Sequence, residues 1–188
     1  MLLLVLYFPC VFTITKHLIN LKSPNLLWRI QKGGELPDTL HPRVFWINVG
    51  IEDLATTFCS PELVVIGVLG IVEEILARRT EDIVVINGIF PRGDHNSEGY
   101  VAKMGSVKPS LWPEIQKINK ELKFYAKFRD ERVFFFDIGK NFFVNPEANT
   151  NDLKLKKALM PDYFHLSEAG YKLWAKEIIK TLQTISKK

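Results

Sequence analysis

A chain of 188 residues is long enough for one domain with a buried core. Its net charge of +4 is small for this length. Hydrophobic residues make up 47% and charged residues 24% of the chain, which excludes an intrinsically disordered protein. Two cysteines, Cys10 and Cys59, exclude a disulfide framework, and no cluster of His and Cys predicts a metal site. We therefore expect neither a metal nor another cofactor.

The first residues, Met1–Ile14, are almost wholly apolar. This stretch is shorter than the roughly 20 residues of a membrane-spanning helix. No positive residue precedes it and no clear cleavage pattern follows, so the signs of a signal peptide are incomplete. A buried strand, a secretory signal and a membrane contact all stay open, and we favour a cytoplasmic location. We take residues 1–24 as an apolar N-terminal segment and residues 25–188 as one domain.

Downstream of residue 25, helical patterns alternate with β-rich apolar runs. The buried strands are predicted at residues 43–49, 83–89 and 133–138. The helices are predicted at residues 26–30, 61–79 and 112–128 and after Ser167. Ser60 is expected to cap the second helix, whose first half is apolar nearly all round and should pack on more than one side. The order predicts a parallel sheet covered by helices, with ligands bound beyond the carboxyl ends of the strands.

The strongest functional signal is the run Asp162-Tyr163-Phe164-His165, just ahead of the last predicted helix. An Asp three residues before a His can form the base half of a hydrolytic triad. The carboxylate fixes the imidazole tautomer, and the ring takes a proton from a nucleophile. The lysines of residues 151–188 alternate with core-type residues, so we interpret them as a solvated helix face and expect no nucleic-acid partner.

From Leu27 to the C-terminus the chain resembles the SGNH (GDSL-type) hydrolases, and among them the catalytic subunits of intracellular platelet-activating-factor acetylhydrolase. The resemblance is carried by the runs at residues 27–30 with 34–36, 49–53, 87–93 and 162–166. It implies a three-layer α/β/α flavodoxin-like fold with a parallel sheet, and hydrolysis of acyl or acetyl esters. It also implies that His165 is the general base and that Asp162 orients it.

The other three elements of that family's site do not match. The family's Gly-x-Asn-Asp run reads Gly50-Ile51-Glu52-Asp53, so Gly50 remains as an oxyanion-side backbone donor and Glu52 replaces the expected asparagine. A carboxylate cannot donate to an oxyanion, and its charge repels one. Residues 20–25 contain no glycine where a Gly-rich loop is expected, and residues 1–19 contain no serine for the Gly-Asp-Ser turn.

The nucleophile is therefore unknown. The serines of the chain are Ser23, Ser60, Ser97, Ser106, Ser110, Ser167 and Ser186. Ser23 is the least unsuitable replacement because it lies near the missing glycine loop. Ser97 follows the wrong strand, and Ser60 and Ser167 are expected helix caps. A new acid–base site of Glu52 and Asp53 with His165 is a further hypothesis. Adjacent residues on a strand point to opposite faces, so these two carboxylates converge only if the strand has already ended.

Two explanations of the mismatch stay open. The first βα unit is missing or has been replaced by Met1–Ile14, which could refill the place of the first strand, central in flavodoxin-like sheets. Alternatively, the chain is a non-catalytic binding or membrane-tethered relative of the fold. The resemblance implies a small acyl-ester or lipid-like substrate and a homodimer, and residues 1–14 are a candidate membrane contact.

Overall fold

The computed structural model describes residues 11–15, 22–32, 34–93, 98–101 and 110–186. The chain divides into two compact units. The first, called here the sheet unit, comprises residues 1–89 and 117–136. The second, called the loop unit, comprises residues 90–116 and 137–188.

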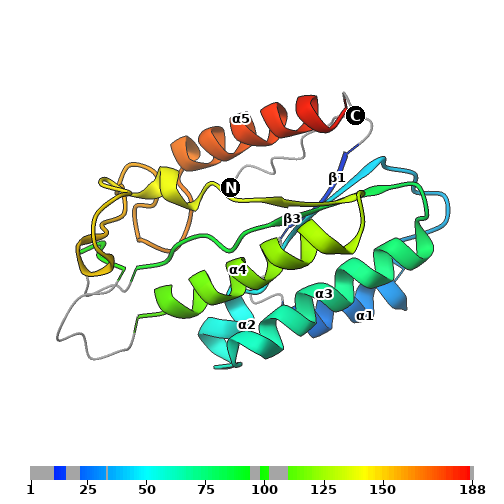
Figure 1. Cartoon of the computed structure of the whole chain (residues 1–188), viewed down its shortest axis with the longest axis horizontal. Coiled ribbons are helices and arrows are strands. Elements are labelled where there is room, and N and C mark those ends of the chain that lie inside the picture. The colour runs from blue at the N-terminus through cyan, green and yellow to red at the C-terminus, as the bar shows by residue number, and fades with distance from the viewer. Residues whose placement is uncertain (1–10, 16–21, 33, 94–97, 102–109, 187–188) are drawn as a thin grey trace. The chain divides into compact units, whose positions relative to one another are not determined.

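The sheet unit is built on four parallel strands (Figure 1). They are β1 (Val11–Thr15), β2 (Val44–Asn48), β3 (Ile83–Asn87) and β4 (Val133–Phe136), in the spatial order β1-β2-β3-β4. The three strands predicted from the sequence are confirmed, each a few residues shorter than expected. Phe45, Trp46 and Val85 have almost no exposed surface, as expected for central parallel strands buried on both faces.

Part of the apolar N-terminal segment forms a strand, which was one of the alternatives left open by the sequence. Val11–Thr15 forms β1 and pairs in parallel with β2, so a βα unit of β1 and the following helix precedes β2. Within the described sheet, β1 lies at the edge beside β2, whereas the first strand of a flavodoxin-like sheet is expected to be central. Residues 1–10 of the predicted strand lie outside the described part of the chain.

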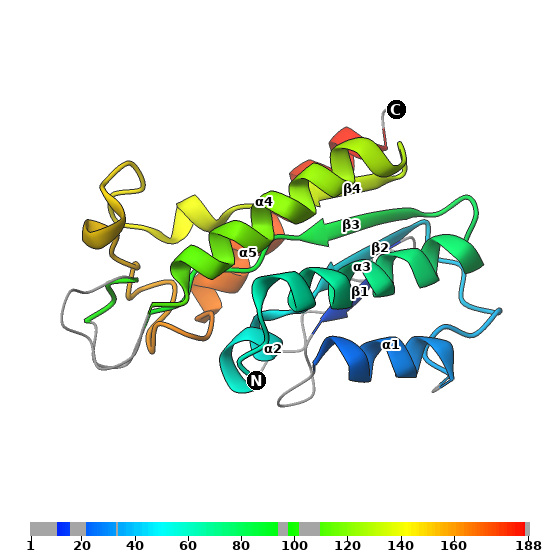
Figure 2. The same ribbon diagram turned by 60° about the horizontal axis from the view of Figure 1, so that its bottom comes forward.

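Four helices are connected to these strands. They are α1 (Ser23–Gln31), α2 (Ile51–Thr56), α3 (Pro61–Arg78) and α4 (Trp112–Arg129). Figure 2 shows α1 and α3 side by side. A Cβ atom built on Gly67 would lie 2.7 Å from the Cβ of Ser23, so only glycine permits this close approach. The short helix predicted at residues 26–30 is thus part of a nine-residue helix.

Helix α3 begins as predicted, with the Ser60 hydroxyl accepting from the amide of Leu63. Its first half packs on more than one side, as expected, because Val64 and Val68 are buried and Gly67 lies against Ser23 of α1. Two apolar residues of this half, Leu63 and Ile66, are nevertheless 58% and 64% exposed.

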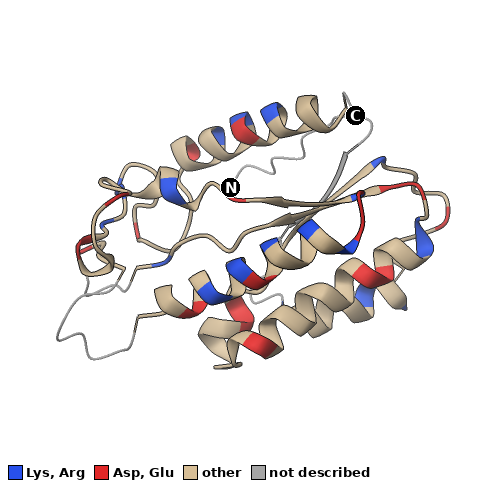
Figure 3. Cartoon of the chain, in the orientation of Figure 1, with Lys and Arg blue, Asp and Glu red and all other residues tan. Residues whose placement is uncertain are grey.

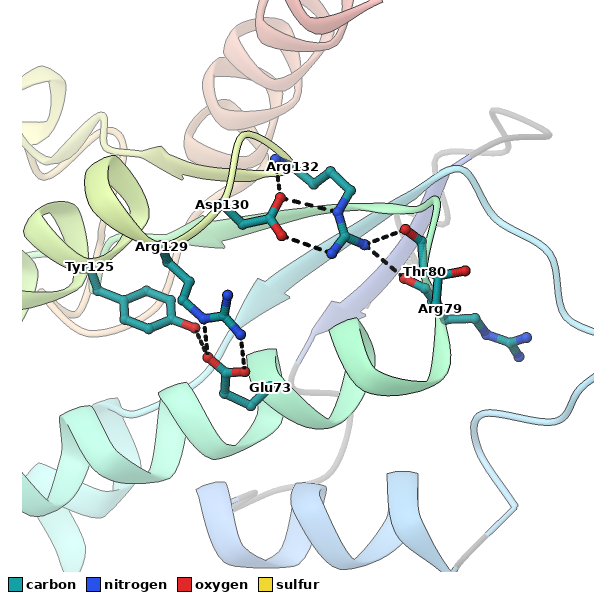
Figure 4. Close-up of polar contacts among 7 residues, drawn as sticks. All are labelled: Glu73, Arg79, Thr80, Tyr125, Arg129, Asp130 and Arg132. Carbon is teal, nitrogen blue, oxygen red and sulfur yellow. Dashed lines mark hydrogen bonds and ion pairs between the residues drawn. The ribbon is translucent and has the colours of Figure 1, made fainter.

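Helix α4 is tied to α3 by charged groups (Figure 4). The carboxylate of Glu73 accepts from Nε and Nη2 of Arg129, at 2.8 and 2.9 Å, and from the hydroxyl of Tyr125. The hydrogen bond from Arg129 lowers the pKa of Glu73, and burial together with that carboxylate raises the pKa of Tyr125. Arg132 pairs with Asp130 at 2.8 Å and donates to the carbonyl of Thr80, which links β4 to the turn before β3.

The loop unit consists of extended segments, two short 3₁₀ helices, η1 (Gly139–Phe142) and η2 (Thr150–Asp152), and the helix α5 (Glu168–Ile185). Its aromatic core centres on Phe90, whose ring centroid lies 5.3 Å from that of Phe142 and 5.7 Å from that of Trp174. Among the described residues, no helix is long and apolar enough to cross a bilayer.

Candidate active site

Asp162 and His165 are brought together by a tight turn in the loop unit. Oδ2 of Asp162 lies 2.6 Å from Nδ1 of His165. Oδ1 of Asp162 accepts from the amides of Phe164 and His165, at 2.9 and 2.7 Å. One carboxylate therefore orders both the turn and the imidazole ring.

The charge state of Asp162 determines the tautomer of His165. Burial raises the pKa of Asp162, but hydrogen bonds from the His165 ring and from the two amides outweigh it and lower that pKa to about 2. At neutral pH the carboxylate can only accept, so Nδ1 of His165 carries the proton. Nε2 is then the basic nitrogen, on a side chain that is 78% exposed. This arrangement suits a general base that is open to a substrate.

Two neighbouring residues hold the turn in place. Tyr163 has a positive φ of 62°, a conformation that costs free energy for a residue other than glycine. Its carbonyl accepts from the amide of Gly93 at 3.0 Å. The guanidinium of Arg92 lies 4.3 Å from the centre of the Phe164 ring. Sequence reasoning missed Arg92 and Gly93 as supports, although both lie in the run at residues 87–93 that carried the resemblance.

Gly50, Glu52 and Asp53 lie at the start of α2 in the sheet unit. The strand β2 ends at Asn48, so Glu52 and Asp53 are on a helix and the argument from alternating strand side chains does not apply to them. Gly50 has a φ of +118°, and a Cβ atom there would lie 3.0 Å from Val64 Cγ1. Both backbone and packing thus require glycine at this position.

Asp53 serves a structural purpose. Its two carboxylate oxygens each lie 3.1 Å from the amide of Ser23, and Oδ2 accepts from the Ser23 hydroxyl at 2.9 Å. The residue before α1, Lys22, provides no side-chain cap, so Asp53 caps this helix from a distance of 30 residues in sequence. Asp53 is therefore already engaged, which disfavours it as a member of a new acid–base site.

Glu52 is buried, with 7% of its surface exposed. It lies in the first turn of α2, two residues after Gly50, where the family pattern has its asparagine. A carboxylate differs from the amide of that asparagine in having no N–H group to donate.

The described serines do not include an obvious nucleophile. Ser23 is 1% exposed and its hydroxyl donates to Asp53, which does not suit attack on a substrate. The Ser110 and Ser167 hydroxyls donate to the carbonyls of Val101 and Ala158. Ser60 and Ser167 cap helices as predicted, and the hydroxyl of Ser186 donates to the carbonyl of Leu182 in the last turn of α5. Ser97 and Ser106 lie outside the described residues.

The predicted site residues thus form two groups. Asp162 and His165 contact each other in the loop unit, and Gly50, Glu52 and Asp53 are neighbours on α2 in the sheet unit. Within the described part of the chain, no three side chains of His, Cys, Asp or Glu are placed to hold a metal ion.

Comparison with known proteins identifies the family. The profile of the GDSL-like lipases and acylhydrolases matches residues 16–178. The chain belongs to the GDSL-like lipase/acylhydrolase family. The resemblance inferred from the sequence motifs is confirmed. No protein of curated function matches the chain in sequence.

Solved structures agree with this assignment. A GDSL-like lipase from Bacteroides thetaiotaomicron VPI-5482 is 18% identical with a TM-score of 0.67, over 88% of this chain and 73% of that chain. A protein from Bacteroides fragilis NCTC 9343, provisionally described as an acylhydrolase, is 20% identical with a TM-score of 0.66, over 88% and 72%. A protein from Streptococcus pneumonia, provisionally described as a platelet activating factor, is 16% identical with a TM-score of 0.64, over 87% and 69%.

At these identities the likeness concerns the fold. The GDSL-like family has the three-layer α/β/α fold of the SGNH hydrolases, and the parallel sheet with its connecting helices is consistent with it. The fold class predicted from the alternation of strands and helices is confirmed.

Proposed function

We propose that this chain has the fold of an enzyme that hydrolyses acyl or acetyl carboxylic esters, and that its own serine-dependent hydrolysis is impaired or absent. The observation that carries the proposal is the buried carboxylate of Glu52, beside Gly50, in the place of the oxyanion asparagine. The coarser assignment, a member of the acylhydrolase family, rests on the match over residues 16–178.

The base half of the chemistry is retained. With Asp162 ionised, Nε2 of His165 can take the proton from an attacking hydroxyl, and Asp162 stabilises the imidazolium that forms. The same ring can return the proton to the leaving alcohol. These residues supply general acid–base catalysis, which contributes typically about 10²–10⁴-fold.

The oxyanion half is altered. Loss of one hydrogen-bond donor to a tetrahedral intermediate typically lowers the rate by about 10²–10³-fold. Glu52 removes the donor and adds a carboxylate, which repels the developing oxyanion. The amide of Gly50 remains as a donor, but one amide does not offset that repulsion.

The proposal is tested by treating the folded chain with a fluorophosphonate serine probe and by measuring hydrolysis of p-nitrophenyl acetate. We expect no adduct and no turnover above a His165→Ala control. A serine adduct that depends on His165, found by mass spectrometry, would contradict the proposal and would identify the nucleophile.

Two variants separate the causes of impairment. If a nucleophile is present and Glu52 alone limits it, Glu52→Asn should raise turnover by about 10²–10³-fold. Glu52→Gln, which is neutral but one methylene longer, is the matched control for charge without the expected geometry. If neither variant is active, the missing nucleophile is the limiting defect.

A non-catalytic binding or membrane-tethered relative is the alternative function. In that case a small acyl-ester or lipid-like molecule would be a ligand, residues 1–14 would contact a membrane, and a homodimer would be the working assembly. Detergent phase partitioning of the full chain and of a variant without residues 1–16 tests the tether. Equal partitioning of the two proteins would exclude it.

A further inference from the structure

The outward face of α4 carries two phenylalanines that do not contribute to the core of the sheet unit. Phe124 and Phe128 are 61% and 64% exposed, and their ring centroids lie 4.7 Å apart. Ile118, Leu122 and Ala126 are the buried residues of the same stretch, and they lie on the other side of the helix. Two adjacent exposed aromatic rings form an apolar patch, which is a candidate interaction surface.

Three lysines flank this pair on one side of the helix. The residues Lys120, Lys123 and Lys127 are exposed and lie one turn or less from the rings. The ammonium group of Lys127 lies 5.0 Å from the centre of the Phe128 ring. Figure 3 shows the basic segments along α4. From residue 117 to residue 128, Glu121 is the one acidic residue, and no ion pair joins the three lysines to any described residue.

We propose that Lys120, Lys123, Phe124, Lys127 and Phe128, called here the α4 face, dock onto an anionic phospholipid surface. Aromatic rings on an exposed helix face enter the boundary between headgroups and acyl chains. The lysines beside them lay their stems along apolar surface and extend the ammonium groups toward lipid phosphates. Charge complementarity with the three lysines specifies the anionic lipid.

Other occupants fit this face less well. A second copy of the chain docked through the same face would bring six lysines together, and like charges repel. Single-stranded nucleic acid binds aromatic rings by stacking bases on open ring faces. Here the two rings are tilted by 49° and contact each other, which leaves no pair of parallel faces for neighbouring bases.

The inference is independent of the proposed function. It concerns α4 and not residues 1–14, and lipid docking stands whether or not the chain hydrolyses esters. Its failure would leave the expectations for Glu52 and His165 unchanged.

Co-sedimentation of the full chain with lipid vesicles is the test. One set of vesicles is phosphatidylcholine, and the other is roughly 3:1 phosphatidylcholine and phosphatidylserine. We expect binding to the second set alone, weakened by salt. A triple variant with Lys120, Lys123 and Lys127 changed to Gln should bind about 100-fold more weakly, and Phe124→Gln with Phe128→Gln at least about 10-fold more weakly.

Two control variants match these changes elsewhere. Leu63→Gln with Ile66→Gln removes an equally exposed apolar pair from α3, and changing Lys172, Lys176 and Lys180 to Gln removes the same charge from α5. Both should bind within about 2-fold of the unaltered chain. Far-ultraviolet circular dichroism confirms that every variant is folded.

Three outcomes would overturn the proposal. The first is equal binding by the α4-face variants and the unaltered chain. The second is equal loss in the control variants, which would show a general effect of charge or apolar surface. The third is binding to a single-stranded oligonucleotide with none to anionic vesicles, which would assign the face to nucleic acid.

Discussion

The turn at Asp162–His165 and the segment at Gly50–Asp53 differ in how far each matches the family's sequence motifs. In the turn, the expected carboxylate is present and lies 2.6 Å from the ring nitrogen of His165. In the segment, glycine is present at a φ of +118° and Asp53 is bound to Ser23, but Glu52 stands where the motif has asparagine. A residue that shapes the backbone can therefore match a family motif while its neighbour in the same motif does not.

Among the changes considered, substitution of Gly50 is expected to destabilise the segment at Gly50–Asp53 the most. Gly50→Ala forces a positive φ on a residue with a Cβ atom that meets Val64 at 3.0 Å and Ile89 at 3.1 Å. We expect a loss of about 3 kcal/mol in the free energy of unfolding, measured with urea. Gly34→Ala is the control, since its φ is +75° but no atom lies within 4 Å of the added Cβ. Equal losses would show that packing at Gly50 does not matter.

Removal of the remote cap is expected to have the next largest effect. Asp53→Ala leaves the buried amide and hydroxyl of Ser23 without an acceptor, so unfolding free energy should fall by about 2 kcal/mol. Ser60→Ala removes an exposed local cap and should cost about 1 kcal/mol. Chemical denaturation of both variants makes the comparison. An effect of Asp53→Ala no larger than that of Ser60→Ala would contradict the assigned role of Asp53.

A double-mutant cycle measures how much the contact between Arg92 and Phe164 stabilises the turn at Asp162–His165. Arg92→Met and Phe164→Leu remove the two partners of one cation–π contact, whose members lie 4.3 Å apart. We expect a coupling energy of about 0.5–1 kcal/mol in the free energy of unfolding. The cycle cancels other contacts of Arg92. A coupling energy near zero would mean that the stacked guanidinium does not stabilise the turn.

The pH dependence of the same turn gives a further test. The folded pKa of Asp162, about 2, lies below its unfolded value of about 3.9. Its contribution is therefore complete above about pH 4 and is lost as the pH falls toward 2. The stability difference between the unaltered chain and Asp162→Asn should narrow over this range. Glu147→Gln, at an exposed residue, is the control. A difference in unfolding free energy between the unaltered chain and Asp162→Asn that stays constant down to pH 2 would contradict the prediction.

The contact between Asp162 and His165 was predictable because the two residues are close in sequence. Asp162 and His165 are three residues apart, and an Asp side chain readily accepts from amides two and three residues ahead. The supports of the turn were not predictable in the same way. Gly93 and Arg92 are about 70 residues away from the groups they contact, and no local pattern connects them.

The exposed surfaces also show the limits of pattern reading. The apolar first half of α3 predicted packing on more than one side, and α3 does contact α1, α2 and β3. Hydropathy nevertheless did not indicate that Leu63 and Ile66 would be exposed. The exposure of Phe124 and Phe128 on α4 likewise required the packed structure.

The strands β2, β3 and β4, the caps Ser60 and Ser167 and the Asp162–His165 pair were predictable because each depends on residues close together along the chain. The family was predictable from the order of several short motifs. The packed structure was needed to find that Asp53 caps α1, that Glu52 is buried and that Ser23 is unsuited to be a nucleophile. These three features depend on contacts between segments that are distant in the sequence. Burial and long-range hydrogen bonds form only when those segments pack together, so local sequence patterns do not predict them.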